Sequence, residues 1–446
     1  MGRLFGTDGI RGLAGQDPIT QQMGRKLGQA VVLFCRQRGN RPIVVIGRDT
    51  RASGNMLEFA VVSGVLSAGG QAYQTGVLPT PGVAFLTKEL CGGAGIVISA
   101  SHNSFEYNGF KVFSHEGFKL SMDEEDEIED LILSKAGLPF NRDHGQAEIV
   151  RDSCDRYVSF LRESLPENCT FKDMKIVLDC SNGATFQVAP ALFQVLDGMI
   201  EALFVAPDGK NINRNCGSQH TDALRQRVLE EGADAGLAFD GDGDRLVAID
   251  EKGYVLTGDR ILTICAKMLR ERGLLKNNLV VSTVMSNTGL RPALKNLGIK
   301  HISTQVGDRH VLEEMMRQNA NLGGEDSGHI IFLDYHTTGD GLLSALQLLF
   351  AIKAFGIQVS ELSTLMKPFP QTLINVPVKT KPDISEVPEL PDVIRRVEQH
   401  LDDRGRVLVR YSGTEPVFRV MVEGEKKEKV EDFAREIAEA VKRNID

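Results

Sequence analysis

The chain has 446 residues, enough for about three or four domains, and this excludes a small binding module. Its composition, 42% hydrophobic and 25% charged residues, is ordinary for a soluble globular protein, while the formal net charge of −9 argues against a nucleic-acid binder. Seven scattered cysteines without a Cys-x-x-Cys spacing, and the lack of a signal-like or bilayer-length apolar run, predict a cytoplasmic protein without a membrane partner.

A short β-branched run followed by a polar loop and a helical pattern occurs three times along the chain. The three segments, which begin at residues 42, 175 and 279, are PIVVIGRDTRASG, KIVLDCSNGA and LVVSTVMSNTG. Such alternation predicts an α/β fold with mostly parallel sheets and helices on both faces, and ligands that bind at the carboxyl ends of the strands. We expect three α/β domains at residues 1–153, 154–254 and 255–366. A smaller domain at 367–446 should follow the proline-interrupted segment 366–371.

The segment GIVISASHNSFEYNGFKVF, residues 95–113, ends an apolar strand-like run on a Ser-His-Asn cluster and places Lys111 ten residues after Ser101. Ser and Asn are ordinary turn residues, so a polar turn is one interpretation. The other is that Ser101 is a nucleophile presented at the carboxyl end of the strand.

The segment DGDGDR, residues 240–245, places Asp240, Asp242 and Asp244 at alternate positions between two apolar strand-like runs. Three carboxylates so close together repel one another, and a hard cation such as Mg²⁺, which prefers oxygen ligands, would hold them together. A solvated acidic turn is the alternative. An EF-hand is excluded because Arg245 stands where the motif needs glycine. A phosphatase of the haloacid-dehalogenase type, with Asp240 as nucleophile, remains an alternative.

Two further loops carry groups that suit a phosphorylated sugar. In GGEDSGH, residues 323–329, Glu325 and Ser327 could bind sugar hydroxyls, and His329 is either structural or a base. In RYSGTEPVFR, residues 410–419, a phosphate cradle could form from an arginine at each end and the polar groups between them: Arg410, Ser412, Gly413, Thr414 and Arg419. Ser-Gly-Thr is also a common sequence in turns, so an ordinary turn is the alternative. Neither a P-loop nor a Gly-x-Gly-x-x-Gly motif occurs.

Together with other stretches, these loops resemble the α-D-phosphohexomutase superfamily, and within it most closely the phosphoglucosamine mutases. The matching segments are FGTDGIRG (5–12), GRDTRASG (47–54), PTPGV (79–83), SASHN (99–103), NGFK (108–111), DGDGDR, GDR (307–309), GGEDSGH and RYSGTEP. They follow one another in order from the first domain to the last. Two residues depart from the usual pattern: Ser104 replaces a proline, and Asp326 replaces a glutamine in the sugar loop.

The resemblance implies four domains arranged like a heart, three related α/β domains with mixed sheets and a smaller α+β domain, around a central cleft. It implies that Ser101 is carried as a phosphoserine. It also implies that glucosamine 6-phosphate and glucosamine 1-phosphate are interconverted through glucosamine 1,6-bisphosphate. This reaction would feed UDP-N-acetylglucosamine synthesis. Phosphomannomutase or phosphoglucomutase activity is the nearest alternative. A non-catalytic phosphosugar-binding protein is a more distant one.

On this basis each motif has an expected role. Asp240, Asp242 and Asp244, with the phosphate on Ser101, would bind Mg²⁺. Positive charge or hydrogen bonds around that phosphate would come from four further residues: Arg11, His102, Lys111 and Arg245. Lys111 or His329 would act as the base. The expected partner is a phosphosugar, with no nucleic acid, and a homodimer is the expected assembly.

Overall fold

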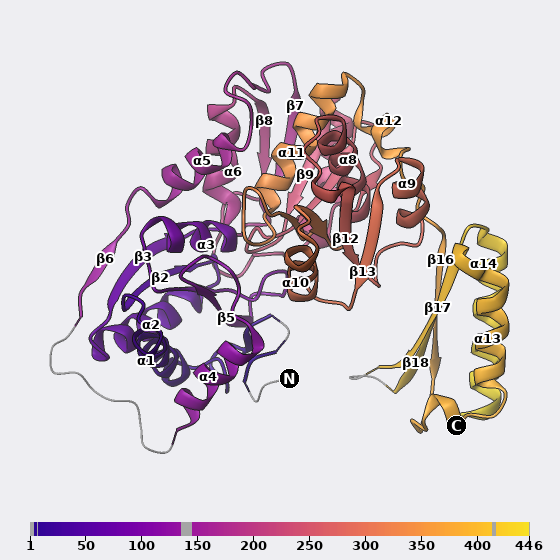
Figure 1. Cartoon of the computed structure of the whole chain (residues 1–446), viewed down its shortest axis with the longest axis horizontal. Helices are drawn as coiled ribbons and strands as arrows, with labels where there is room; N and C mark the ends of the chain where they lie inside the picture. Colours follow the sequence, from indigo (N-terminus) through magenta and orange to yellow (C-terminus); the bar gives the residue numbers. More distant parts are fainter. Residues whose placement is uncertain (1–3, 7, 135–144, 413–415, 446) are drawn as a thin grey trace. The chain divides into compact units, whose positions relative to one another are not determined.

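The computed structural model describes residues 4–6, 8–134, 145–412 and 416–445 (Figure 1). The chain divides into two compact units. The first consists of Met1–Met285 and Ile302–Ser363, and the second of Ser286–His301 and Thr364–Asp446.

The first sheet of the first unit has six strands in the order β1-β5-β4-β2-β3-β6. Their bounds are β1 (Ile10–Leu13), β2 (Ile43–Arg48), β3 (Gln71–Val77), β4 (Ala94–Ile98), β5 (Tyr107–Ser114) and β6 (Ala147–Ile149). Strands β4, β2, β3 and β6 are parallel, while β5 runs antiparallel to both β4 and β1. The sheet is therefore mixed, with the antiparallel strands at one end.

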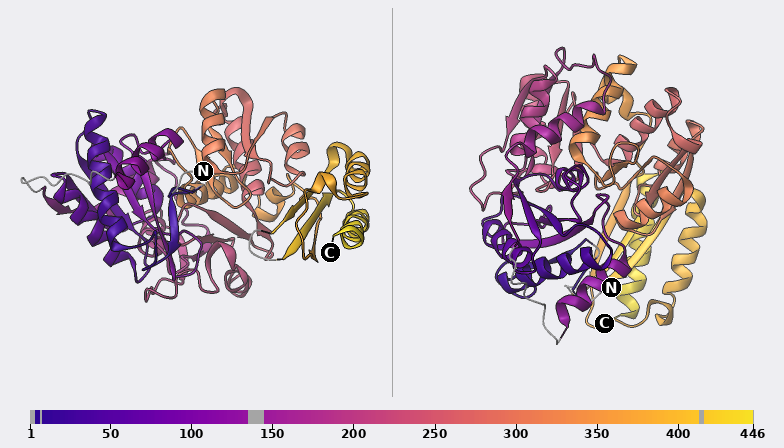
Figure 2. Two further views of the ribbon diagram at one scale, coloured as in Figure 1. Left: turned by 90° about the horizontal axis from the view of Figure 1, so that it is seen from below. Right: turned by 60° about the vertical axis from the view of Figure 1, so that its left-hand side comes forward.

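Helices cover both faces of this sheet, as Figures 1 and 2 show. The helices are α1 (Gln21–Gln37), α2 (Gly54–Ser67), α3 (Thr80–Glu89) and α4 (Met122–Leu133). Because side chains alternate along a strand, Val44 and Ile46 point to one face, where they join one buried cluster with α1, α2 and α4. On the other face α3 packs so closely that a Cβ at Gly95 would lie 2.3 Å from the Thr87 hydroxyl, which explains the glycine.

Two more sheets complete the first unit, in the orders β11-β10-β9-β7-β8 and β13-β12-β14-β15. The strands are β7 (Lys175–Asp179), β8 (Met199–Leu203), β9 (Ala235–Phe239), β10 (Leu246–Asp250), β11 (Val255–Leu256), β12 (Leu279–Thr283), β13 (Lys300–Thr304), β14 (Leu322–Gly324) and β15 (Ile330–Phe332). The helices are α5 (Ser153–Glu163), α6 (Thr185–Val195), α7 (Asp222–Glu231), α8 (Gly258–Glu271), α10 (Asp308–Gln318), α11 (Gly341–Phe355) and α12 (Val359–Ser363).

One arrangement recurs in the three sheets of this unit. A strand that pairs in parallel with its neighbour, namely β4, β9 or β14, ends in a polar loop and is followed by an antiparallel strand, β5, β10 or β15. The three loops are the serine loop, residues 99–106, the acidic loop, residues 240–245, and the sugar loop, residues 325–329. The strand-loop-helix pattern predicted mostly parallel sheets. The antiparallel strands β5, β10 and β15 make all three sheets mixed.

The second unit contains an antiparallel sheet in the order β16-β18-β17. Its elements are α9 (Leu290–Asn296), β16 (Gln371–Pro377), α13 (Leu390–Leu401), β17 (Gly405–Tyr411), β18 (Val417–Gly424) and α14 (Lys427–Asn444). In α14, Val430, Ile437 and Ala440 are fully buried and Phe433 packs against the same core, so the apolar stripe predicted for this helix faces inward.

The predicted α/β class is confirmed, with three mixed α/β sheets and a smaller α+β region at the carboxyl end. Among the described residues, no helix is both long and apolar enough to span a bilayer.

Candidate active site

Ser101 lies directly after β4 and faces the acidic loop of the second sheet. Its side chain is fully buried, its φ is +52°, and its Oγ donates a 2.5 Å hydrogen bond to Oδ2 of Asp240. A positive φ is uncommon for a residue with a side chain and costs conformational free energy, so contacts around the loop must enforce it. The structure therefore supports a presented serine over an ordinary solvated turn.

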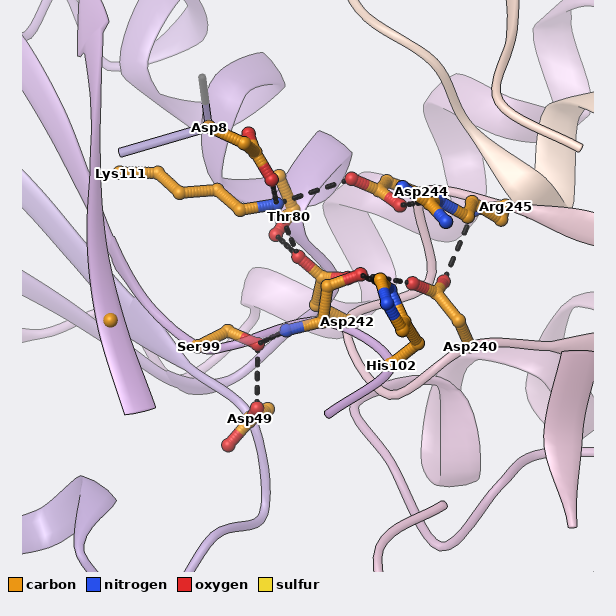
Figure 3. Close-up of polar contacts among 12 residues, drawn as sticks. Asp8, Asp49, Thr80, Ser99, His102, Lys111, Asp240, Asp242, Asp244 and Arg245 are labelled. Carbon is orange, nitrogen blue, oxygen red and sulfur yellow. Dashed lines mark hydrogen bonds and ion pairs between the residues drawn. The ribbon is translucent and has the colours of Figure 1, made fainter. Parts of the chain in front are cut away.

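Two polar side chains behind Ser101 hold it from the strand side. The Ser101 amide donates to Oγ of Ser99 at 2.9 Å, and Ser99 donates in turn to Oδ2 of Asp49 at 2.6 Å (Figure 3). Both residues are completely buried. This chain of hydrogen bonds links the end of β4 to the loop after β2.

Asp240, Asp242 and Asp244 are all buried, and one carboxylate oxygen from each lies within 4.8 Å of the others. Asp242 is held at Oδ2 by the Thr80 hydroxyl at 2.6 Å and by Nζ of Lys111 at 2.8 Å. Thr80 is the first residue of α3, so this helix start also fixes the acidic loop. The acidic turn is thus buried rather than solvated.

The pKa values of Asp240 and Asp244 shift in opposite directions, as expected for crowded acids. Burial, followed by repulsion from Asp244 and Asp242, raises the pKa of Asp240 well above its usual value. Burial also acts to raise the pKa of Asp244, but the nearby Lys111 cation and His329 outweigh it and hold that pKa well below its usual value. The chain's own cations therefore compensate only part of the negative charge.

The triad has carboxylate oxygens that are available to coordinate a cation. Oδ1 of Asp242 and Oδ1 of Asp244 are buried, and no described residue donates a hydrogen bond to either atom. A buried carboxylate oxygen that accepts no hydrogen bond is unfavourable, and coordination by a hard divalent ion would satisfy it. The three residues could therefore hold a metal ion.

Lys111 on β5 is the central cation of the site. Its Nζ contacts Asp242 and also lies 3.2 Å from Asp244 and 3.1 Å from Asp8. Burial alone would lower the pKa of this amine, but the three carboxylates raise it well above the usual value. Lys111 is therefore held as an ammonium group. Asp8 also pairs with Arg11, which ties that predicted phosphate-binding arginine to the same network.

A second lysine, Lys119, links this network to the third sheet. Its Nζ lies 2.6 Å from Oδ1 of Asp8 and also pairs with Asp308, the first residue of α10. Burial acts to lower the pKa of Lys119, but Asp308 and Asp8 raise it to about 12. The ion pairs thus connect the first and third sheets beside the site.

Two other predicted residues, Arg245 and His102, lie against these charges. Arg245 donates its backbone amide to Oδ1 of Asp240 at 3.2 Å, and its Nε is 3.7 Å from Oδ1 of Asp244. His102 is half-buried, with Nδ1 3.5 Å from Oγ of Ser101. Burial, with Arg245 and Arg11, lowers the pKa of His102, which favours the neutral imidazole. In this form it can offer a hydrogen bond.

His329 is buried between two carboxylates. Its Nδ1 lies 3.7 Å from Asp244, and its Nε2 lies 3.4 Å from Asp308 and accepts a hydrogen bond from the Gly339 amide at 3.2 Å. Burial acts to lower the pKa of His329, but Asp244 and Asp308 raise it.

The sugar loop itself is anchored to α10 and α8. Oε1 of Glu325 accepts the Gly307 amide at 3.2 Å, while Ser327 lies 3.5 Å from Oε2 of the same glutamate. Asp326, one of the two departures from the family pattern, accepts the Asp259 amide at 3.4 Å through its side chain. Asp326 therefore has a contact with α8 that is independent of a sugar.

The predicted phosphate cradle lies in the second unit. Arg410 on β17 and Arg419 on β18 are directly opposite one another across the two strands, and Ser412 is buried just after β17. Nζ of Lys381 donates to the Ser412 carbonyl at 2.6 Å, which adds a third cation to this region. Gly413 and Thr414 lie outside the described residues.

The structure thus brings eleven of the predicted residues together in the first unit, and the cradle residues that it describes lie in the second. Sequence reasoning missed several side chains of the central network: Asp8, Asp49, Thr80, Ser99, Lys119 and Asp308. All except Lys119 belong to the matching segments, so their motifs were a signal. Lys119 is in no such segment, and only the fold places it there.

Family models match almost the entire chain. The four described as phosphoglucomutase/phosphomannomutase domains match residues 2–137 (alpha/beta/alpha domain I), 155–253 (domain II), 257–369 (domain III) and 373–440 (C-terminal domain). The chain belongs to the phosphoglucomutase/phosphomannomutase family. Its resemblance to the α-D-phosphohexomutases is thereby confirmed.

Curated relatives of this family are similar over the full chain. The phosphoglucosamine mutase of Syntrophus aciditrophicus is 51% identical and that of Syntrophobacter fumaroxidans 52%, each with 100% of both chains covered. The chain is accordingly a mutase, an isomerase, of the phosphoglucosamine mutase group.

Solved structures of the family share the fold at lower identity. A phosphoglucomutase/phosphomannomutase family protein from Burkholderia thailandensis has a TM-score of 0.80 at 24% identity, covering 99% of this chain and 97% of that one. N-acetylphosphoglucosamine mutase from Aspergillus fumigatus, solved with GlcNAc-6P and magnesium, has a TM-score of 0.66 at 18% identity, covering 99% and 95%.

Proposed function

We propose that this family member interconverts glucosamine 6-phosphate and glucosamine 1-phosphate through a phosphorylated Ser101. The observation that carries the proposal is the 2.5 Å contact between the buried Ser101 hydroxyl and Asp240, within a triad in which two buried carboxylate oxygens accept no hydrogen bond from the described residues. The full-length similarity to phosphoglucosamine mutases supports the choice of sugar.

Phosphoryl transfer depends mainly on in-line positioning and on compensation of negative charge. Ser101 gives its phosphoryl group to the free hydroxyl of the sugar phosphate, and the hydroxyl proton passes to a base. The resulting glucosamine 1,6-bisphosphate turns end for end and returns its other phosphoryl group to Oγ of Ser101. The enzyme is thereby restored, and the phosphate has changed position on the sugar.

Asp240, Asp242 and Asp244 would hold Mg²⁺ together with an oxygen of the phosphorylated Ser101. The ion would supply electrostatic stabilisation of the transferring group. The chain adds its own compensation: Lys111 is held as a cation 2.8 Å from Asp242, and Arg245 lies beside Asp240 and Asp244. Arg11 pairs with Asp8, next to Lys111.

Of the two residues predicted as the base, we favour His329. Nζ of Lys111 has three carboxylate partners within 3.2 Å, so its proton is firmly held. His329 lies between Asp244 and Asp308, where a proton taken from a sugar hydroxyl would be stabilised. Glu325 and Ser327 would bind the sugar hydroxyls, and the substrate's own phosphate would bind Arg410, Ser412, Gly413, Thr414 and Arg419.

A side-by-side assay tests the choice of sugar. Purified protein with Mg²⁺ and a trace of bisphosphorylated primer is given glucosamine 6-phosphate, mannose 6-phosphate or glucose 6-phosphate. We expect the highest kcat/KM for the first. A preference for mannose or glucose phosphate would reassign the enzyme to phosphomannomutase or phosphoglucomutase activity, which the same chemistry could serve.

The alternative of a phosphatase with Asp240 as nucleophile is less compatible with the site. Both oxygens of Asp240 accept hydrogen bonds, one from Ser101 and one from the Arg245 amide. Release of inorganic phosphate from these sugars, faster than their isomerisation and unaffected by Ser101→Ala, would favour the phosphatase.

Three other sequence predictions remain proposals. They are the domain boundaries at 153/154, 254/255 and 366/367, a cytoplasmic location, and a homodimer. Light scattering of the purified protein would test the last, with twice the chain mass of 48.9 kDa as the expected result.

A further inference from the structure

Two of the three repeated strand-loop-helix segments, those that contain β2 and β7, have so far been given no part in the function beyond the contact of Asp49 with Ser99. The first contains Arg51, whose side chain is completely buried. All five N–H groups of a guanidinium can donate, and here all five do. Nε donates to Oδ2 of Asp49 at 2.8 Å, and the other four donate to backbone carbonyls of the serine loop and of the residue that begins β5: Ser101, Asn103, Ser104 and Tyr107.

The second segment is linked to the same carbonyls through Asn213, which lies in the loop between β8 and α7. Nδ2 of Asn213 donates to the carbonyl of Ser101 at 2.8 Å and to that of Asn103 at 2.9 Å. Asn213 has a φ of +57°, and its amide donates to the Ser181 carbonyl in the loop after β7 at 2.9 Å. That loop is in turn fixed by Asp179, a fully buried carboxylate that accepts the Ser181 and Gly217 amides at 2.8 Å.

The carbonyls of Ser101 and Asn103 therefore each accept two hydrogen bonds, one from the first sheet's Arg51 and one from the second sheet's Asn213. A carbonyl oxygen has two lone pairs, so this arrangement leaves neither carbonyl free to rotate toward another donor. The acidic loop packs on the same point: a Cβ at Gly241 would lie 2.5 Å from the Ser101 carbonyl oxygen and 2.7 Å from Nδ2 of Asn213.

We propose that Arg51 and Asn213 form a clamp, the carbonyl clamp, that sets the position of the Ser101 side chain relative to Asp240. Neither residue touches the reacting atoms, so both are positioning residues. The clamp holds Ser101 at its positive φ, which brings Oγ to Asp240. Small misplacements of a reacting group slow a reaction that depends on alignment. This inference rests on the proposed function, because it concerns the transfer from Ser101.

Asn213→Gly tests the clamp with little risk to the fold, because glycine accepts a positive φ while losing both donated hydrogen bonds. The matched control is Asn215→Gly, since Asn215 has a φ of +54° in the same segment but is exposed. For Asn213→Gly we expect kcat to fall about ten- to a hundred-fold with KM unchanged, and for the control both values should match the parent.

A second measurement distinguishes a misplaced Ser101 side chain from a general loss of order in the surrounding loops. Phosphorylated enzyme without sugar loses phosphate to water, and intact-mass spectra follow this loss. In Asn213→Gly the ratio of transfer to water over transfer to sugar should rise. Asn213→Asp, which keeps the size and backbone preference but replaces the donor by an acceptor, should lower kcat further still.

If the kcat of Asn213→Gly stayed within about two-fold of Asn215→Gly, with an unchanged partition between water and sugar, the clamp would be rejected. Rejection of the clamp is distinguishable from failure of the proposed function. If the proposed function failed, the parent protein itself would isomerise none of the three hexose phosphates, whatever the residue at position 213.

Discussion

The acidic triad of the first unit and the paired arginines of the second differ in how their charge is compensated. At the triad, Lys111 contacts Asp242 and Asp244, and beside it Lys119 contacts Asp8 and Asp308, so cations of the chain itself offset part of the negative charge. On β17 and β18, Arg410 and Arg419 are directly opposite one another, and two guanidinium groups so placed suit the binding of an anion. We infer that the first region is set before substrate binds and governs kcat, while the second depends on the ligand and governs KM.

The largest effect should follow from a change in the triad. Asp242→Asn removes a charge from a buried oxygen pair in which Oδ1 has no partner. We expect kcat to fall about 10²- to 10³-fold, because preorganised electrostatic stabilisation is the main contribution to such a reaction. The Mg²⁺ concentration for half-maximal activity should rise. Calorimetric titration with Mg²⁺ and steady-state kinetics measure these two changes.

The matched control for this variant is Asp126→Asn on the exposed side of α4, which should leave both quantities as in the parent. Wild-type kcat and Mg²⁺ dependence in Asp242→Asn would show that the triad does not bind the ion used in catalysis.

The next effect should distinguish the second region from the first. Arg410→Ala removes one of the two opposed arginines, and a charge-assisted hydrogen bond to phosphate is worth about 1.5–3 kcal/mol. We therefore expect kcat/KM to fall roughly ten- to a hundred-fold, mainly through KM. The exposed Arg395→Ala is the control. A fall in kcat with KM unchanged would contradict the division of roles between the two regions.

A smaller effect concerns the packing of the first region. In Gly241→Ala the added methyl group would meet backbone and side-chain atoms at 2.5 and 2.7 Å. Overpacking of this kind costs about 1–3 kcal/mol, so Tm should fall by several degrees, as calorimetry can measure. An unchanged Tm and kcat would mean that the acidic and serine loops are less tightly packed than the structure shows.

The smallest effect is a pH dependence of stability from His336. Its Nε2 contacts the Pro81 carbonyl at 2.9 Å, near the start of α3 that also holds Asp242, and its Nδ1 accepts the Thr337 amide at 2.8 Å. Burial, with a small contribution from Lys88, lowers the pKa of His336 from 6.5 to about 4. Between these values the unfolded chain binds a proton that the folded chain does not.

The stability that neutral His336 provides is therefore complete above about pH 6.5 and is lost as the pH falls toward 4, by at most about 3 kcal/mol. Denaturant unfolding at several pH values measures this change. His336→Gln, which lacks the titrating group, should show a shallower decrease over the same range. If the free energy of unfolding changed equally with pH in the two proteins, His336 would be excluded as a source of this pH dependence.

The sequence predicted the chemical role of the loops better than the contacts that hold the loops in place. Asp240, Asp242 and Asp244 could be found because their alternate spacing is local and has few chemical explanations. Arg51, whose segment was noted, could not be assigned a role, because its partners lie about 50 residues away and are backbone carbonyls, which any residue provides. Lys119 had no local signal, since its contact with Asp308 exists only when the first and third sheets meet.

The strand order was also only partly predictable. The apolar runs before the loops indicated strands, and the strand-like run predicted after the Asp240, Asp242 and Asp244 triad is β10. The antiparallel pairing of β10 with β9 depends on long-range register and on a short loop, and the β-branched composition alone favoured parallel sheets.

The most direct test of the account is the activity of Ser101→Ala. In the presence of Mg²⁺ and without bisphosphorylated primer, the account predicts that this variant has lost nearly all interconversion of glucosamine 6-phosphate and glucosamine 1-phosphate. Given glucosamine 1,6-bisphosphate as phosphoryl donor in a separate incubation, it should also take up no phosphate at the peptide that contains position 101, whereas the parent does. A variant that isomerises glucosamine phosphate as fast as the parent would contradict the central role of Ser101.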